Sequence, residues 1–227
     1  MAGAAFLLGN AEEVGNIQDG VGAGIDLYKL YTGDGSAAAG WPTKDQWVSF
    51  EDMFNANRAM MRASCVNLGA DCGANNSGEE IDQIWNAIQF VAHLAGVDHR
   101  FILAVMLQES KGCVRVRTTG SGLANPGLRQ SHNGQYSCNQ NSVVLNPCPG
   151  SHIFGMIHEG VRGTMDGDGI AGVLNKVATC DDAGQYISGS IPDETRLEIA
   201  GLSTACYASD IANRLTGWVV APSQCHF

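Results

Sequence analysis

The residue best placed to do chemistry is Glu109, which stands near the end of a helix predicted for residues 99–110. Val105 and Met106 belong to the apolar stripe of this helix, and Glu109 follows them at i+4 and i+3, so we expect it on the buried face. A poorly solvated carboxyl group has a raised pKa. A glutamic acid that keeps its proton can give it to a glycosidic oxygen. The position alone also fits a half-exposed glutamate without a catalytic role.

Two segments near Glu109 carry a recognisable pattern. Residues 108–112 read QESKG and residues 125–131 read NPGLRQS. Together they resemble the signature of lytic transglycosylases and goose-type lysozymes, in which a helix ends in Glu-Ser and a Gly-Leu-Met-Gln segment follows. Residues 185–189, QYISG, look like the Tyr-Asn-x-Gly element of that family. The resemblance covers roughly residues 80–220, and it is closest to secreted fungal members with several disulfides. Arg129 replaces the usual Met and Ile187 the usual Asn.

The resemblance implies a role for each matching residue. Glu109 would be the catalytic acid and base, and Gln130 and Tyr186 would line a sugar-binding groove. The amide of Gln130 suits sugar hydroxyls or an N-acetyl group, and Tyr186 can hydrogen-bond the leaving oxygen or orient Glu109. Gly127 would let the backbone approach the ligand closely. Further groove residues would be Asn125, Ser131 and His132, although His132 fits a surface histidine equally well.

A hydrolase that uses two carboxylates needs a second acid near the first. After Glu109 the next acidic residue is Glu159, followed by Asp166 and Asp168. The second acid could therefore be Asp166, Asp168, or Asp34 of the amino-terminal segment. Two alternatives stay open. The N-acetyl group of the substrate could act as the nucleophile, or a lytic transglycosylase could work with one glutamate and release an anhydro product.

The charge of the chain restricts its partners. The 227 residues carry a formal net charge of −10 with a pI of about 4.9. No basic patch offsets this charge, so nucleic acid is excluded as a partner. An acidic enzyme is also repelled from anionic bacterial cell walls at neutral pH, and the repulsion fades near about pH 4–5. An acidic working environment would reconcile the charge with such a substrate.

Eight cysteines predict four disulfides and therefore an oxidising, extracellular compartment. Spacing does not determine the pairing. The short spans Cys65–Cys72 and Cys138–Cys148 are hypothesised as local loops. The cysteines are Cys65, Cys72, Cys113, Cys138, Cys148, Cys180, Cys206 and Cys225.

Other motifs contribute little chemistry. No apolar run approaches the ~20 residues of a membrane span. Residues 166–169, DGDG, resemble part of a calcium loop but lack its later acidic ligands, so they are interpreted as a turn and helix N-cap. We therefore expect no metal or cofactor. The sequon Asn75-Asn76-Ser77 makes Asn75 a candidate for N-glycosylation in a eukaryotic secretory pathway.

The elements that must position these residues are mainly helical. Ser77 and Glu80 form a capping-box pattern before a helix that ends at Gly96, and Asp98 is a suitable N-cap for the helix of Glu109. Further helical patterns cover residues 47–54, 153–160, 168–177 and 208–218, the last with Ile211 and Leu215 facing inward. Residues 118–149 are predicted to be loops with a short hairpin.

These observations predict a mainly α, lysozyme-like domain over residues 77–227, with long loops and with residues 1–76 packed on it as an extension. The expected function is that of a secreted, monomeric muramidase that hydrolyses the β-1,4 bonds of peptidoglycan. A lytic transglycosylase and a chitinase are the enzymatic alternatives. A non-catalytic glycan-binding protein is the alternative from another class.

Overall fold

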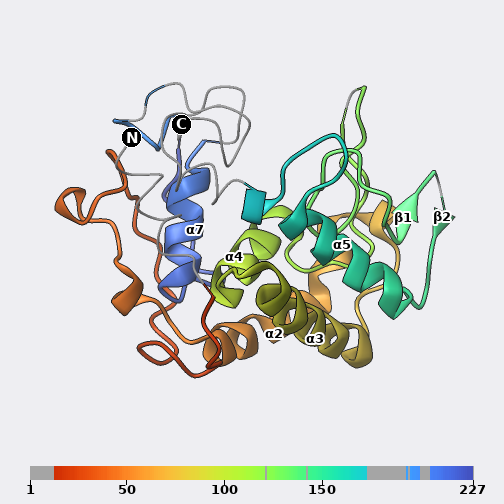
Figure 1. The fold of residues 1–227 in the computed structure, drawn as a ribbon, viewed down its shortest axis with the longest axis horizontal. Helices are drawn as coiled ribbons and strands as arrows, with labels where there is room; N and C mark the ends of the chain where they lie inside the picture. Colours follow the sequence, from red (N-terminus) through yellow and green to blue (C-terminus); the bar gives the residue numbers. More distant parts are fainter. Residues whose placement is uncertain are drawn as a thin grey trace. The chain divides into compact units, whose positions relative to one another are not determined.

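The computed structural model describes residues 13–120, 122–141, 143–172, 193, 195–199 and 205–226. Contacts divide the chain into two compact units, Phe54–Gly172 on the one hand and Met1–Met53 with Val173–Phe227 on the other. The described residues are mainly helical, as predicted, with one small hairpin (Figure 1). The contacts thus group the chain differently from the expected division at residue 77. None of the helices in the described ranges is long and apolar enough to span a membrane.

Two capped helices follow each other in the unit Phe54–Gly172. Helix α3, Gly78–Ala95, begins with the predicted capping box, in which the Ser77 hydroxyl accepts from Glu80 N and the Glu80 carboxylate accepts from Ser77 N. It ends at Gly96 with a φ of 65°. Helix α4, His99–Ser110, begins at the Asp98 side chain, which accepts from Arg100 N. The sequence therefore predicted both helices correctly.

Two more helices contribute to this unit. Helix α2 spans Phe50–Leu68, and helix α5 spans Gly150–Arg162. Helix α3 packs against α4 and α5, and α3 and α5 run side by side in Figure 1. Apolar side chains spaced three or four residues apart on α3 are wholly buried there: Ile81, Ile84, Ile88 and Val91.

The loops of this unit contain the predicted hairpin. Strand β1, Asn139–Gln140, pairs antiparallel with β2, Val143–Val144. A short 3₁₀ helix, Ala70–Cys72, follows α2. The residues before and after the hairpin are held by hydrogen bonds and disulfides more than by regular elements, as expected for long loops.

Three disulfides lie within the described residues, Cys65–Cys113, Cys138–Cys148 and Cys206–Cys225. The Cys138–Cys148 hypothesis is confirmed, and the Cys65–Cys72 hypothesis is wrong. Cys72 is a buried thiol, and Cys180 lies outside the described residues.

The physical reason for the pairing of Cys65 lies in Asn76. Its Nδ2 donates to Met61 O of α2 at 2.9 Å and to Gly112 O at 2.7 Å. The turn after α4 is thereby held against α2, and Cys113 is brought opposite Cys65. A contact of this kind, between segments distant in sequence, leaves no trace in cysteine spacing.

The other unit contains helix α7, Tyr207–Leu215, in which Ile211 and Leu215 are wholly buried as predicted. The backbone of the amino-terminal segment is hydrogen-bonded to side chains of α7. Lys29 N donates to Asn213 Oδ1, Asn213 Nδ2 donates to Lys29 O, and Tyr31 N donates to the Ser209 hydroxyl. The segment is irregular apart from two 3₁₀ helices, Ala37–Ala39 and Lys44–Gln46.

Candidate functional site

Glu109 stands in the last turn of α4. The remainder of this helix is buried from His99 to Leu107, and Ser110 is buried as well, whereas Gln108 and Glu109 are half-buried. The apolar stripe therefore does not mark a single buried face, because nearly every side of α4 is covered by other parts of the protein. Glu109 lies where this internal helix reaches the protein surface, and the residue is partly exposed.

The residues after Glu109 fix the end of the helix. The Ser110 hydroxyl donates to Met106 O at 3.1 Å and accepts from Gly112 N at 3.2 Å. Lys111 adopts a left-handed conformation with a φ of 53°, and its N–H returns to Leu107 O. In the Glu-Ser pair, the serine thus closes the helix and sets the backbone position of the glutamate.

The described residues of the loop 117–131 are held together by Gln130. Thr119 and Asn125 pair through two backbone hydrogen bonds, of 3.2 and 2.7 Å. The Gln130 amide nitrogen donates to Arg117 O at 3.3 Å and to Gly127 O at 3.0 Å, and its oxygen accepts from the Thr119 hydroxyl at 2.6 Å. Both N–H groups of this amide are thereby used inside the loop. To donate to a sugar as predicted, the Gln130 amide would have to exchange one of these backbone hydrogen bonds for a bond to the sugar.

Gly127 packs against Met156 of helix α5, and this packing accounts for the glycine without a bound ligand. Its φ is 76°, and a Cβ atom there would lie 2.6 Å from Met156 Cγ and 2.9 Å from Tyr136 O. The next residue, Leu128, donates its N–H to Met156 Sδ at 3.3 Å. The conformation and the close packing both require glycine. This is a different reason from the close approach to a ligand that the sequence suggested.

Arg129 connects the same loop to two helices. Its Nη1 donates to Ile102 O of α4 at 3.2 Å. A Cβ atom on Gly160 of α5 would lie 2.4 Å from Arg129 Cβ, so the side-chain stem packs directly on that glycine. The loop with the NPGLRQS sequence is therefore fixed to α4, the helix that carries Glu109, and to α5.

Asn125 and Ser131 also belong to this loop, and His132 follows it directly. Asn125 is half-buried and His132 is exposed. His132 O accepts from the Thr164 hydroxyl at 2.6 Å. Ser131 is 8% exposed, and its hydroxyl has no hydrogen-bond partner among the described residues. Tyr186 lies outside the described residues, as does Ile187.

The acidic residues considered as a second carboxylate have other contacts. Asp166 accepts from Asn133 Nδ2 at 2.5 Å in a bend. Asp34, which belongs to the other compact unit, accepts from the Ser36 side chain and backbone, and these bonds lower its pKa. The Glu159 carboxylate of α5 accepts from the N–H groups of Gln135 and Tyr136. Glu159 thus supports the backbone of the adjacent loop.

Residues 165–167 form a bend, and helical residues begin at Ile170. Within the described ranges, no group of three or more His, Cys, Asp or Glu side chains could hold a metal ion.

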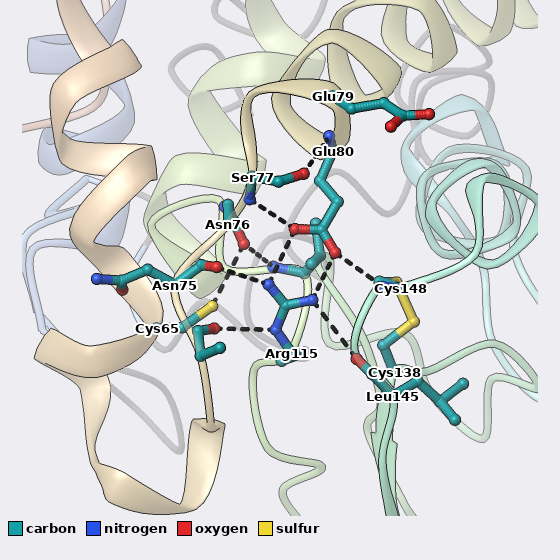
Figure 2. Close-up of polar contacts among 12 residues, drawn as sticks. Cys65, Asn75, Asn76, Ser77, Glu79, Glu80, Arg115, Cys138, Leu145 and Cys148 are labelled. Atoms are coloured by element: carbon teal, nitrogen blue, oxygen red, sulfur yellow. Dashed lines mark hydrogen bonds and ion pairs between the residues drawn. A yellow bond between two sulfur atoms is a disulfide. The ribbon is translucent and has the colours of Figure 1, made fainter.

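A buried ion pair was not anticipated from the sequence. Glu80 had a predicted role in capping α3, but its carboxylate also accepts from both terminal nitrogens of Arg115 (Figure 2). Glu80 Oε1 accepts in addition from Cys148 N at 2.8 Å. Burial by itself raises the pKa of Glu80, but the bonds from Arg115, Ser77 N and Cys148 N outweigh it and lower the pKa. No spacing rule connects Glu80 with Arg115, so sequence patterns offered no signal for the pair.

Comparison with known proteins adds no relative: no protein-family model, no curated protein and no solved structure matches the chain.

Proposed function

We propose that this chain is a glycan-cleaving enzyme of the lysozyme-like class, with Glu109 as its general acid and peptidoglycan as its first substrate. One observation carries the proposal. Helix α4 is buried except at Gln108 and Glu109, and the loop that contains Gly127 and Gln130 is fixed to this same helix by Arg129. The helix that carries Glu109 and the loop held by Arg129 thus belong to one unit and are joined by a hydrogen bond at Ile102. The three disulfides of the described residues support an oxidising compartment for such an enzyme.

The chemistry needs a proton at the leaving oxygen when the glycosidic bond breaks. A half-buried glutamate suits this step, since a substrate oxygen can reach it while part of its surroundings stays dry. Ser110 and the turn after it fix the end of α4, so the carboxyl group starts from a defined backbone position. Glu159 is already bonded to loop backbone, which favours a mechanism with one glutamate or with the N-acetyl group as nucleophile.

The test is Glu109→Gln, which keeps the size of the side chain and removes the transferable proton. Turnover of Gram-positive cell walls at acidic pH should fall by at least about 100-fold, the range expected for loss of a general acid. Glu79→Gln is the matched control, because Glu79 is an exposed glutamate of the same unit. Near-normal turnover by Glu109→Gln would overturn the assignment.

The masses of the products distinguish the enzymatic alternatives. A hydrolase leaves a reducing end, whereas a lytic transglycosylase leaves an anhydro-muramyl end that is lighter by one water. Release of short oligomers from chitin, with no release from cell walls, would identify a chitinase.

One observation favours a second candidate, a glycan-binding protein without turnover. The amide of Gln130 is engaged inside its own loop, so the residue expected to contact sugar is not held ready for it. Binding of cell-wall glycan without any product between about pH 3 and about pH 8 would support this candidate over the enzyme.

A further inference from the structure

The sequon residue Asn75 presents its side chain at the surface. Asn75 is exposed, and its Oδ1 accepts from Val66 N near the end of α2 at 2.9 Å. Its Nδ2, the atom that carries a glycan, has no hydrogen bond among the described residues. In Figure 2 the side chain points away from Arg115, whereas the Asn75 carbonyl oxygen accepts from Arg115 Nη2 at 2.9 Å. The backbone is therefore anchored on one side, and the amide nitrogen remains accessible on the other.

Apolar side chains are exposed in the segments that contact this loop. Val66 and Leu68, in the last turn of α2, are 57% and 40% exposed, and Val144 of β2 is 39% exposed. A Cβ atom on Gly73 would lie 2.9 Å from Val144 Cγ1, so the hairpin reaches the loop two residues before Asn75. We call Val66, Leu68 and Val144 the apolar patch. Val66 bonds to Asn75 through its backbone and Val144 lies against Gly73, so a glycan on Asn75 would start beside these exposed aliphatic side chains.

We propose that Asn75 is N-glycosylated and that its first sugars cover the apolar patch. The expected occupant is the glycan of Asn75, because the Asn75 side chain accepts a hydrogen bond from the backbone N–H of Val66, a member of the patch. The C–H faces of a sugar ring can pack on aliphatic side chains while its hydroxyl groups remain in water. The glycan would thereby replace a water-exposed apolar surface with a polar one.

The modification is a group transfer from a lipid-pyrophosphate-linked oligosaccharide in a eukaryotic secretory pathway. A bond forms between Asn75 Nδ2 and C1 of the first sugar, and the bond between C1 and the pyrophosphate oxygen breaks. The amide nitrogen gives up one proton, and the lipid pyrophosphate leaves. No electrons are gained or lost.

Occupancy is tested with the full chain secreted from a eukaryotic host. Its intact mass should exceed that of the polypeptide, and peptide-N-glycosidase should remove the excess and convert Asn75 to Asp. The variant Asn75→Asp keeps an acceptor for Val66 N and should lack the excess mass. Ser77→Thr keeps both the sequon and the helix cap, and should retain it. A polypeptide without the excess, or an excess that persists in Asn75→Asp, overturns the proposal.

Coverage is tested by comparing the glycosylated protein with the same chain made in a bacterium that lacks N-glycosylation. The bacterial protein should bind more of a dye that reports apolar surface and should precipitate at lower concentration. Val66→Ser with Val144→Ser should remove most of this difference. Equal dye binding and solubility of the two preparations would refute coverage of the patch, even if the glycan is present. Neither test uses glycan cleavage, so its outcome is independent of the proposed function.

Discussion

Arg115 donates to both carboxylate oxygens of Glu80, with a distance of 2.9 Å between Nη2 and Oε2, and both side chains are almost wholly buried. The remaining Arg115 donors also have partners, since Nε donates to Ala74 O and Nη2 to Asn75 O. The pair joins the first turn of α3 to the loop before it and to Cys148 (Figure 2). The pair links several segments of the unit. Removing either partner would leave the other as a buried charge without a countercharge.

Glu80→Gln should lower the free energy of unfolding by about 3–5 kcal/mol, because it leaves the buried Arg115 without a countercharge. Glu79→Gln, the same change on the exposed neighbouring residue, should stay within about 0.5 kcal/mol. Urea unfolding followed by circular dichroism measures both. A cost below about 1 kcal/mol for Glu80→Gln would show that the pair contributes little.

The same pair predicts how stability depends on pH. The pKa of Glu80 is lower in the folded protein than its ordinary value of 4.5. Its contribution is therefore complete above pH 4.5 and is lost as the pH falls through the lowered folded value. The difference in unfolding free energy between the wild type and Glu80→Gln should be constant near neutral pH and shrink in acid. A difference that grows in acid would contradict the prediction. Because the folded pKa is low, the ion pair should persist under mildly acidic conditions.

Local signals predicted helices α3 and α4 well. Ser77, Gly96 and Asp98 act through neighbours within a few residues, so their pattern determines where α3 and α4 begin and end. The burial of Glu109 was predicted less well, because the stripe on α4 describes only one face and the surrounding chain covers the others. Elements enclosed on all sides lose the periodicity on which such predictions depend.

The contacts of the candidate site could not be predicted, because they join distant segments. The pairing of Cys65 with Cys113 depends on Asn76, and the position of the glycine-containing loop depends on Arg129 and α5. The residue types in this loop suggested sugar recognition, whereas the structure shows what holds the loop in place. A motif indicates which residues matter, but side-chain roles follow from tertiary contacts.

Gly127→Ala should lower the free energy of unfolding more than Gly96→Ala does, although both glycines have a positive φ, of 76° and 65°. Gly96 has open space around an added Cβ, so only conformational strain of about 1–2 kcal/mol is expected there. At Gly127 the added atom meets Met156, and overpacking adds about 1–3 kcal/mol. Thermal unfolding of the two variants measures the difference. Equal costs would show that Met156 moves aside without strain.

Peptide mapping without reduction should recover the cross-linked pairs found among the described residues, Cys65–Cys113, Cys138–Cys148 and Cys206–Cys225. Cys72 is buried, so a thiol reagent should label it slowly in the native protein and rapidly after unfolding in denaturant. Cys72→Ala should leave the three pairs unchanged. A Cys65–Cys72 peptide from the native protein would refute the pairing described above.

Thr119→Val distinguishes two roles for Gln130. The substitution removes the hydroxyl that donates to Gln130 Oε1 over 2.6 Å and leaves the Gln130 side chain intact. If Gln130 acts by bracing the loop, Thr119→Val should lower cell-wall turnover and reduce stability by about 0.5–1.5 kcal/mol, the usual net contribution of one hydrogen bond. If Gln130 instead contacts the sugar directly, freeing its oxygen should leave turnover unchanged or increase it, while Gln130→Leu still abolishes it. Kinetics of both variants on cell walls, with unfolding curves as the control for stability, separate the two roles. We expect a loss in both variants, because three hydrogen bonds of the Gln130 amide already lie within the loop.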